Sequence, residues 1–155
     1  MQRDPSDGRK TDTIKIRRAK AGDASQIAVL SGQLGYPATR GQIVQRFRKI
    51  GPGSSHAVFV AELRDRGVIG WIHVSITPLL ELDLRAEVNG LVVADAARSL
   101  GAGALLLRSA EQWALRRRCK SMSVRSNVLR ERAHEFYLRN GYEHYKTQKA
   151  FRKML

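Results

Sequence analysis

The sequence predicts a single α/β domain in which a mixed sheet is flanked by helices. Short strand-like segments alternate with amphipathic helical segments along the chain, and internal repeats are absent. The chain has 155 residues, enough for one domain with one core, and 43% of them are apolar. We therefore expect one domain over residues 14–155. Residues 1–13 are polar and lack strand alternation or a secretory apolar core, which predicts a disordered tail.

The chain is expected to begin with a strand and a helix. Ile14 and Ile16 alternate with basic residues, as in a strand with one buried face. A helix is predicted to begin at Asp23, with Gln26 at the capping-box position. The sequence GYP at residues 35–37 ends this helix.

A second helix and a hairpin are predicted next. Thr39 and Gln42 repeat the capping pattern, and the sequence GPG at residues 51–53 ends the helix that they start. Two extended segments, 56–63 and 68–77, are joined by the turn RDRG. This arrangement is typical of a hairpin.

The remainder of the chain predicts strand, helix, strand, helix and strand. The expected ranges are a strand over about 85–93, a helix over 101–118, a strand over 121–126, a helix over 131–140 and one or more closing strands over 142–155. The mixed sheet would therefore be built from segments on both sides of the 101–118 helix.

The stretch from Glu87 to Gly103 predicts a strand that leads through a glycine-containing turn into a helix. The first N–H groups of a helix have no partner inside it and lie at the positive end of the macrodipole, so they attract phosphate. Gly101 and Gly103 would let a diphosphate approach the main chain, and Arg98 adds a cation. A plain strand-to-helix turn is the alternative. The turn has neither the lysine of a nucleotide-hydrolysing P-loop nor the third glycine of a dinucleotide fingerprint.

Charge and cysteine usage narrow the function classes. The chain holds 28 Lys and Arg against 14 Asp and Glu, a net charge of +14. Because the cations are spread along the chain, we expect only non-specific nucleic-acid binding at low salt and a negatively charged cofactor as the main beneficiary. Cys119 is alone and the four histidines are scattered, which predicts no disulfide, no metal site and a bystander thiol. The single cysteine favours a reducing cytoplasm. No membrane partner is expected, since no apolar run approaches spanning length.

Two blocks of the sequence resemble the Gcn5-related N-acetyltransferase (GNAT) family. RSLGAG, preceded by a strand ending in LVV, fits the family's RxxGxG/A signature. SNVLRERAHEFYLRNGY, residues 126–142, is similar to the late block, in which an asparagine closes a strand and a helix carries FY before a glycine and an aromatic residue. The resemblance runs from about Ile14 to the C-terminus. It implies a mostly antiparallel sheet that splays between its fourth and fifth strands, with the thioester of acetyl-CoA in the gap.

The resemblance also implies which residues hold acetyl-CoA. The pantetheine arm would pair with the main chain of the fourth strand, where Gly90 predicts a bulge or a close approach, or is simply a buried strand glycine. The implied cofactor-binding residues are Leu91, Val92, Val93, Arg98, Ser99, Leu100, Gly101, Ala102, Gly103, Ala104, Asn127 and Phe136.

Acetyl transfer to an amine needs a neutral amine, a stabilised oxyanion and a proton for the departing thiolate. The resemblance implies Tyr137 as the proton donor, and a core tyrosine is the alternative. Glu87, eleven residues before Arg98, has the spacing of the general base in some members. A chain of water molecules as base, with Glu87 merely solvated or paired, is equally open. A main-chain N–H near Val92 or Val93 could hold the oxyanion.

The acceptor site is less clearly encoded. Glu81, Asp83 and Glu87 follow a period of two and would share one face of a continuous strand, where they could receive a cationic amine. An ordinary solvent face neutralised by Arg85 is the alternative. Tyr36 lies where the family closes its acceptor site. The candidate substrate-binding residues are Tyr36, Glu81 and Asp83.

These observations predict an N-acetyltransferase that moves the acetyl group of acetyl-CoA directly to a primary amine. The block AHEFY is similar to members that include aminoglycoside 6'-N-acetyltransferases, which favours a small cationic or aminoglycoside-like acceptor. A protein N-terminus or lysine is the alternative acceptor. A catalytically silent module that binds CoA or nucleic acid is the alternative from another class, and a homodimer is left open.

Overall fold

The structure is a computed structural model that describes residues 13–51, 53 and 55–155. The chain divides into two compact units, residues 1–124 and residues 125–155, and each is described by itself. Except for Thr13, the predicted disordered tail lies outside the described residues.

The first unit contains a five-stranded sheet in the order β1-β2-β3-β4-β5. Strands β1 to β4 pair with one another in antiparallel order, and β5 joins β4 in parallel. The mixed sheet is therefore confirmed. The strands are β1 (Lys15–Arg18), β2 (His56–Leu63), β3 (Gly67–Ile76), β4 (Arg85–Val93) and β5 (Ser121–Val124).

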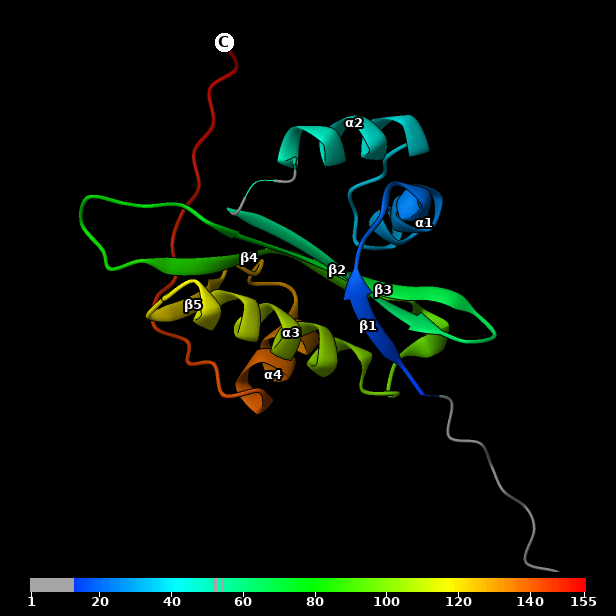
Figure 1. Cartoon of the computed structure of the whole chain (residues 1–155). Helices are drawn as coiled ribbons and strands as arrows, with labels where there is room; N and C mark the ends of the chain where they lie inside the picture. Colours follow the sequence, from blue (N-terminus) through cyan, green and yellow to red (C-terminus); the bar gives the residue numbers. More distant parts are fainter. Residues whose placement is uncertain (1–12, 52, 54) are drawn as a thin grey trace, which may run out of the picture. The chain divides into compact units, whose positions relative to one another are not determined.

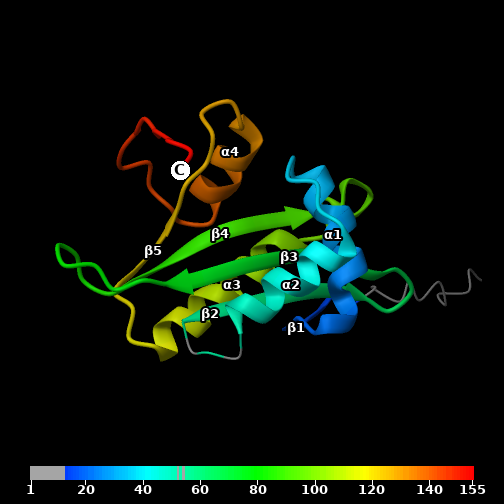
Figure 2. The same ribbon diagram turned by 90° about the horizontal axis from the view of Figure 1, so that it is seen from above.

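Helices cover both faces of this sheet (Figure 1). A 3-10 turn (Ala21–Asp23) leads into α1 (Ala24–Gln33), and α2 (Arg40–Ile50) follows on the same face. A second 3-10 turn (Asp95–Ala97) leads into α3 (Ala102–Arg116) on the opposite face. The view from above shows α2 lying over the strands (Figure 2).

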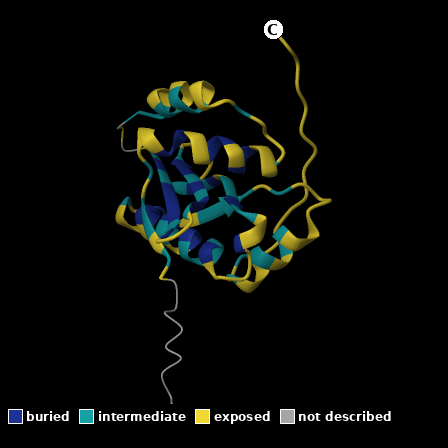
Figure 3. Cartoon of the chain, turned by 90° about the vertical axis from the view of Figure 1, so that its right-hand side faces the viewer, coloured by how far each residue is buried: buried dark blue, intermediate teal, exposed yellow. Residues whose placement is uncertain are grey.

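The core has two parts, one on each face of the sheet. Under α3, the side chains of Leu106 and Trp113 are almost fully buried, as are Ile72 and Val74 of β3. Under α1, the buried cluster consists of Ile27, Leu30, Val60, Val68 and Val92. In contrast, α2 contains no buried residue, and Figure 3 shows it in the colours of exposed and intermediate residues.

The two predicted capping boxes have different outcomes. Thr39 accepts the N–H of Gln42 at 3.1 Å, and the amide of Gln42 accepts the N–H of Thr39 at 3.0 Å, so that box is confirmed. The box at Asp23 is wrong, because its carboxylate makes no cap bond to α1 and instead binds Arg17 with both oxygens at 2.8 and 2.9 Å. A bidentate ion pair is stronger than a neutral cap. The guanidinium of Arg17 accordingly holds the pKa of Asp23 below its usual range.

A β-bulge interrupts β4 at the predicted position. His73 pairs with Gly90 and Val74 pairs with Val88, so Asn89 is the extra residue. A Cβ on Gly90 would lie 2.7 Å from the ring of Trp71, which explains the glycine. Pairing between β4 and β5 ends at Val88, and β4 continues to Val93 with β3 on one side only. This geometry confirms the splay between the fourth and fifth strands.

The second unit contains one helix, α4 (Glu131–Arg139), among its described residues. The predicted closing strand over 142–155 is wrong, since residues 143–155 adopt neither strand nor helix. A strand requires a neighbouring strand to satisfy its backbone groups, and residues 125–155 provide none.

Replacing Gly90 with alanine should destabilise the first unit. The added methyl group would overlap the Trp71 ring, so we expect a loss of about 1–3 kcal/mol in the free energy of unfolding. Gly32→Ala is the matched control, because nothing lies within 4 Å of a Cβ there. In a helix this control should gain about 0.5–1 kcal/mol. Urea unfolding followed by circular dichroism measures both, and equal stability of Gly90→Ala and wild type would contradict the close contact.

Candidate active site

The turn before α3 has the geometry of an anion site. Ser99 and Gly101 have φ angles of 72° and 84°, a left-handed conformation that is unusual for serine. No side chain caps α3, and its first main-chain bond runs from the N–H of Leu105 to the carbonyl of Gly101 at 3.2 Å. The N–H groups of the first helical residues are therefore left to bind a ligand. These residues are Ala102, Gly103 and Ala104.

Arg98 and Leu100 flank this turn. The guanidinium of Arg98 forms an ion pair with Asp95 at 2.6 Å, with both side chains exposed. Exposed pairs contribute about 0–1 kcal/mol, so a diphosphate can compete for Arg98. Leu100 is half exposed, whereas Ala102 is buried and anchors the start of α3.

The splayed edge of β4 offers main-chain groups next to this turn. The N–H of Ala94 donates to Ile69 of the opposite strand at 2.7 Å. The N–H and carbonyl groups of successive residues alternate between the two edges of a strand. The main-chain groups of Val92 therefore also point to β3, and those of Leu91 and Val93 point to the opposite edge, where β5 no longer pairs with β4. Of the two predicted oxyanion donors, only the N–H of Val93 thus faces the gap.

Gln33, at the end of α1, forms hydrogen bonds to the main chain at the end of β4. Its amide donates to the carbonyl of Val93 at 2.7 Å and accepts the N–H of Asp95 at 3.0 Å. These two bonds connect α1 to the point where β4 leaves the sheet. Sequence reasoning did not single out Gln33, because its partners lie about sixty residues away.

A cavity of about 370 Å³ lies between the α1 and α2 layer and the sheet. Its volume falls in the range of about 300–1,000 Å³ that is usual for small-molecule sites. It reaches β4 at Asn89, the residue that follows the last pair between β4 and β5. The cavity is lined by Ile27, Ser31, Leu34, Tyr36, Ile43, Arg46, Phe47, Ile50, Val58, Trp71, His73 and Asn89.

The sheet side of the cavity carries a polar network. His73 lies 3.0 Å from His56 between ring nitrogens, and the two rings stack. Asn89 donates to the hydroxyl of Ser75 at 2.7 Å. Burial lowers the pKa of His73 to about 4, and the charge of His56 adds to the shift. His73 is therefore neutral at pH 7.

The residues predicted to bind the acceptor substrate do not lie together in the structure. Tyr36 lines the cavity. Glu81 and Asp83 are exposed in the loop before β4, which begins at Arg85, so the three acidic residues do not form one continuous strand face. Glu87 pairs with Ser75 across the sheet, which puts it on the same face as His73, but it does not line the cavity. A role for Glu81 and Asp83 in substrate binding stays a prediction.

The second unit holds the remaining predicted residues. The ring of Tyr137 packs edge-on against Phe136 and Tyr142, with centroids 5.2 and 5.6 Å apart. Burial raises the pKa of Tyr137 to about 12, with a smaller opposite effect of Arg130, so its hydroxyl is protonated at neutral pH. Asn127 accepts the N–H of Leu129 at 2.9 Å and forms a local turn.

Sequence reasoning missed most of the cavity wall. Arg46, Trp71, His73 and Asn89 belong to two strands and a helix far apart in the chain. The histidine pair had a usable signal, since the RDRG turn sets the register of the hairpin that contains His56 and His73. No sequence signal identified Arg46 as a cavity residue, because an arginine on a predicted helix is normally solvated.

A model of the acetyltransferase (GNAT) family matches residues 31–142. The chain belongs to this family. Its GNAT fold and its dependence on acetyl-CoA as acetyl donor, both predicted from the two sequence blocks, are thereby confirmed. No curated protein sequence gives a significant match.

Solved structures share the GNAT fold at low sequence identity. A transcriptional regulator from Bacillus halodurans C-125 is 24% identical, with a TM-score of 0.80 over 91% of this chain and 100% of the other. Aminoglycoside N-acetyltransferase AAC(6')-Iy in complex with CoA is 18% identical, with a TM-score of 0.81 over 92% and 96%. Glucosamine-6-phosphate N-acetyltransferase from Arabidopsis thaliana is 19% identical, with a TM-score of 0.78 over 90% and 98%.

The described residues offer neither a metal site nor a membrane-spanning helix. Within the described residues, no three His, Cys, Asp or Glu side chains are grouped so that they could hold a metal ion. No helix in the described part of the chain is both long and apolar enough to cross a membrane. Cys119 is a buried free thiol, and burial raises its pKa, which suits a bystander rather than a nucleophile.

Replacing Gly101 with glutamate should abolish acetyl-CoA binding. The new carboxylate would lie at the first N–H groups of α3, where it would repel a diphosphate. Gly101→Asn is the matched control, because asparagine tolerates the left-handed conformation and adds no charge. Calorimetric titration measures affinity, and circular dichroism confirms folding. Unchanged affinity of folded Gly101→Glu would refute the assignment of the turn.

Acidification should destabilise the first unit through His73. Above pH 6.5, the usual histidine pKa, the ring is neutral in both the folded and the unfolded protein. Between pH 6.5 and about 4 only the unfolded chain binds the proton, so the free energy of unfolding falls as pH falls. The total loss is on the order of 3 kcal/mol. Urea unfolding across this range should show a shallower slope for His73→Gln than for the wild type. Identical slopes for the two proteins would contradict the shift.

Proposed function

We propose that this enzyme acetylates the primary amine of a small molecule that binds in the cavity under α2. One observation carries the proposal. The cavity reaches β4 at Asn89, directly after the last pair between β4 and β5, so an amine there would lie beside the edge from which β5 diverges. The amine would attack the thioester directly, without an acyl-enzyme.

The residues of the first unit would bind and orient the donor. The free N–H groups at the start of α3, assisted by Arg98, would hold the diphosphate, and the main chain of Leu91 would pair with the pantetheine arm. Acetyl-CoA supplies the activated acetyl group when bound. The N–H of Val93 would stabilise the developing oxyanion, and Gln33 keeps that residue in place through its carbonyl.

Tyr137 and Glu87 are the proposed proton carriers. The family resemblance and the raised pKa of Tyr137 both support a neutral hydroxyl that donates to the departing thiolate. Glu87 would accept the amine proton directly or through water, and a chain of water molecules alone is the alternative. Asn127 and Phe136 stay predicted cofactor contacts.

The acceptor could belong to several chemical classes. The structural neighbours include an enzyme named for aminoglycosides and one named for glucosamine-6-phosphate, an amine that carries an anion. A small cationic or aminoglycoside-like amine, the acceptor predicted from sequence, therefore belongs in the test beside anionic amines. Protein amines and a catalytically silent module are the remaining alternatives. The cytoplasm stays the predicted location, consistent with one free cysteine.

The proposal is tested by calorimetric titration with acetyl-CoA followed by a thiol-release assay over amines, aminoglycosides and peptides. Turnover on small amines is expected, and turnover on peptides alone would overturn the small-molecule proposal. Tyr137→Phe should lower kcat by about 10²-fold and leave the affinity for acetyl-CoA unchanged. Tyr145→Phe is the matched control, because Tyr145 is exposed in the same unit. If Tyr137→Phe retains wild-type kcat, another group protonates the thiolate.

A further inference from the structure

We infer that the acceptor is an amphipathic amine that bears a carboxylate or similar anion facing Arg46, rather than a polycation. This inference rests on the proposed function, since it assigns a substrate class to the same cavity. It depends on the charges of the cavity wall, on its apolar surface and on the position of Asn89 in β4.

The wall of the cavity contains one charged side chain, Arg46 of α2, and no carboxylate among the described residues. Arg46 forms no ion pair with a carboxylate of the described residues, unlike Arg17 and Arg98. A polycation in this cavity would have to lose part of its hydration beside a cation and without a counterion, which is unfavourable. An anion would instead gain a charged hydrogen-bond donor.

Most of the cavity wall is apolar. Ile43, Phe47 and Ile50 of α2 line it together with Trp71 and Val58 of the sheet. The indole N–H of Trp71 is buried and does not reach the surface of the cavity. The matching ligand has an apolar body of modest size.

Arg46 and Asn89 bring different chemistry to the cavity. Arg46 belongs to α2, and Asn89 belongs to the β4 bulge next to the splayed edge. An anion held at Arg46 would leave the amine of the ligand to reach β4 at Asn89. Neutral His73 and Asn89 carry no negative charge, and Glu87, the proposed base, lies on the same face of the sheet as His73, so an amine there can lose its proton and become nucleophilic.

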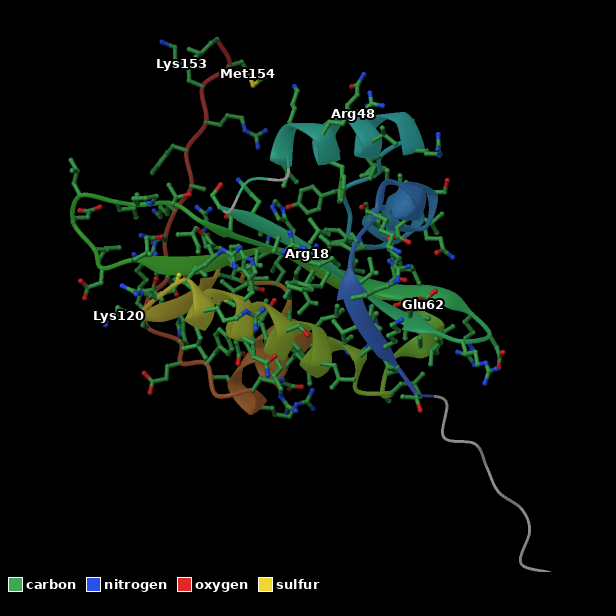
Figure 4. All side chains as sticks on the ribbon, in the orientation of Figure 1. Arg18, Arg48, Glu62, Lys120, Lys153 and Met154 are labelled. Atoms are coloured by element: carbon green, nitrogen blue, oxygen red, sulfur yellow. The ribbon has the colours of Figure 1, made fainter. Side chains whose placement is uncertain are left out.

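The test uses three amines with one body and different charges: para-(aminomethyl)benzoate, para-(aminomethyl)benzamide and para-xylylenediamine, with kanamycin as a polycation. Thiol release with acetyl-CoA gives kcat/KM for each. We expect the carboxylate to exceed the diamine by about tenfold or more. Arg46→Glu should reverse this order. Arg48→Glu should keep it, because Arg48 (Figure 4), which like Arg46 is exposed on α2, does not line the cavity.

Preference of the wild type for kanamycin or the diamine would overturn the inference while leaving acetyl transfer intact. An unchanged order in Arg46→Glu would overturn it as well. If no amine is acetylated, binding of the amine is measured by tryptophan fluorescence, because Trp71 lines the cavity. The variant Trp71→Phe identifies the part of the signal that comes from Trp71. A change on adding the benzoate that Arg46→Glu abolishes would support the inference although the proposed function fails. Absence of any change with the benzoate would reject both.

Discussion

Strand β4 has two edges, and only one of them is paired along its whole length. Pairing with β3 continues to Val93, whereas pairing with β5 ends at Val88. The bulge at Asn89 separates these two regions, and Gly90 allows the ring of Trp71 to lie against the strand. The open main-chain edge begins at this break, and the cavity reaches it at Asn89. A change that restored regular pairing here would remove the site.

Helices α1 and α2 lie on the same face of the sheet but contribute differently to the packing of the core. Helix α1 is anchored by Ile27 and Leu30 in the buried cluster, and Gln33 at its end connects to β4. Helix α2 buries no residue fully, because its apolar side covers the cavity instead of a packed core. The wall that would contact the acceptor is thus the part of this layer with the least packing energy. Substitutions on α2 can change specificity at little cost in stability.

The total positive charge says little about function, whereas the surroundings of individual arginines differ clearly. Arg17 forms ion pairs with Asp23 and Glu62, which stabilise the fold. Arg98 is in a weak exposed pair beside the α3 turn, which suits the diphosphate of acetyl-CoA. Arg46 lines the cavity without a carboxylate. The formal charge of +14 therefore includes cations in three different surroundings.

The sequence by itself determined the family, the donor and most of the elements, because the α3 turn and the strands β2 and β4 are encoded by contiguous residues. It also predicted the bulge at Gly90, since a glycine inside a strand is a local signal. It could not predict that Asp23 binds Arg17 of β1 instead of capping α1, or the absence of the last strand. Only the tertiary structure decided the lining of the cavity. Arg46, Trp71 and Asn89 meet there through strand register and helix packing, which no local pattern records.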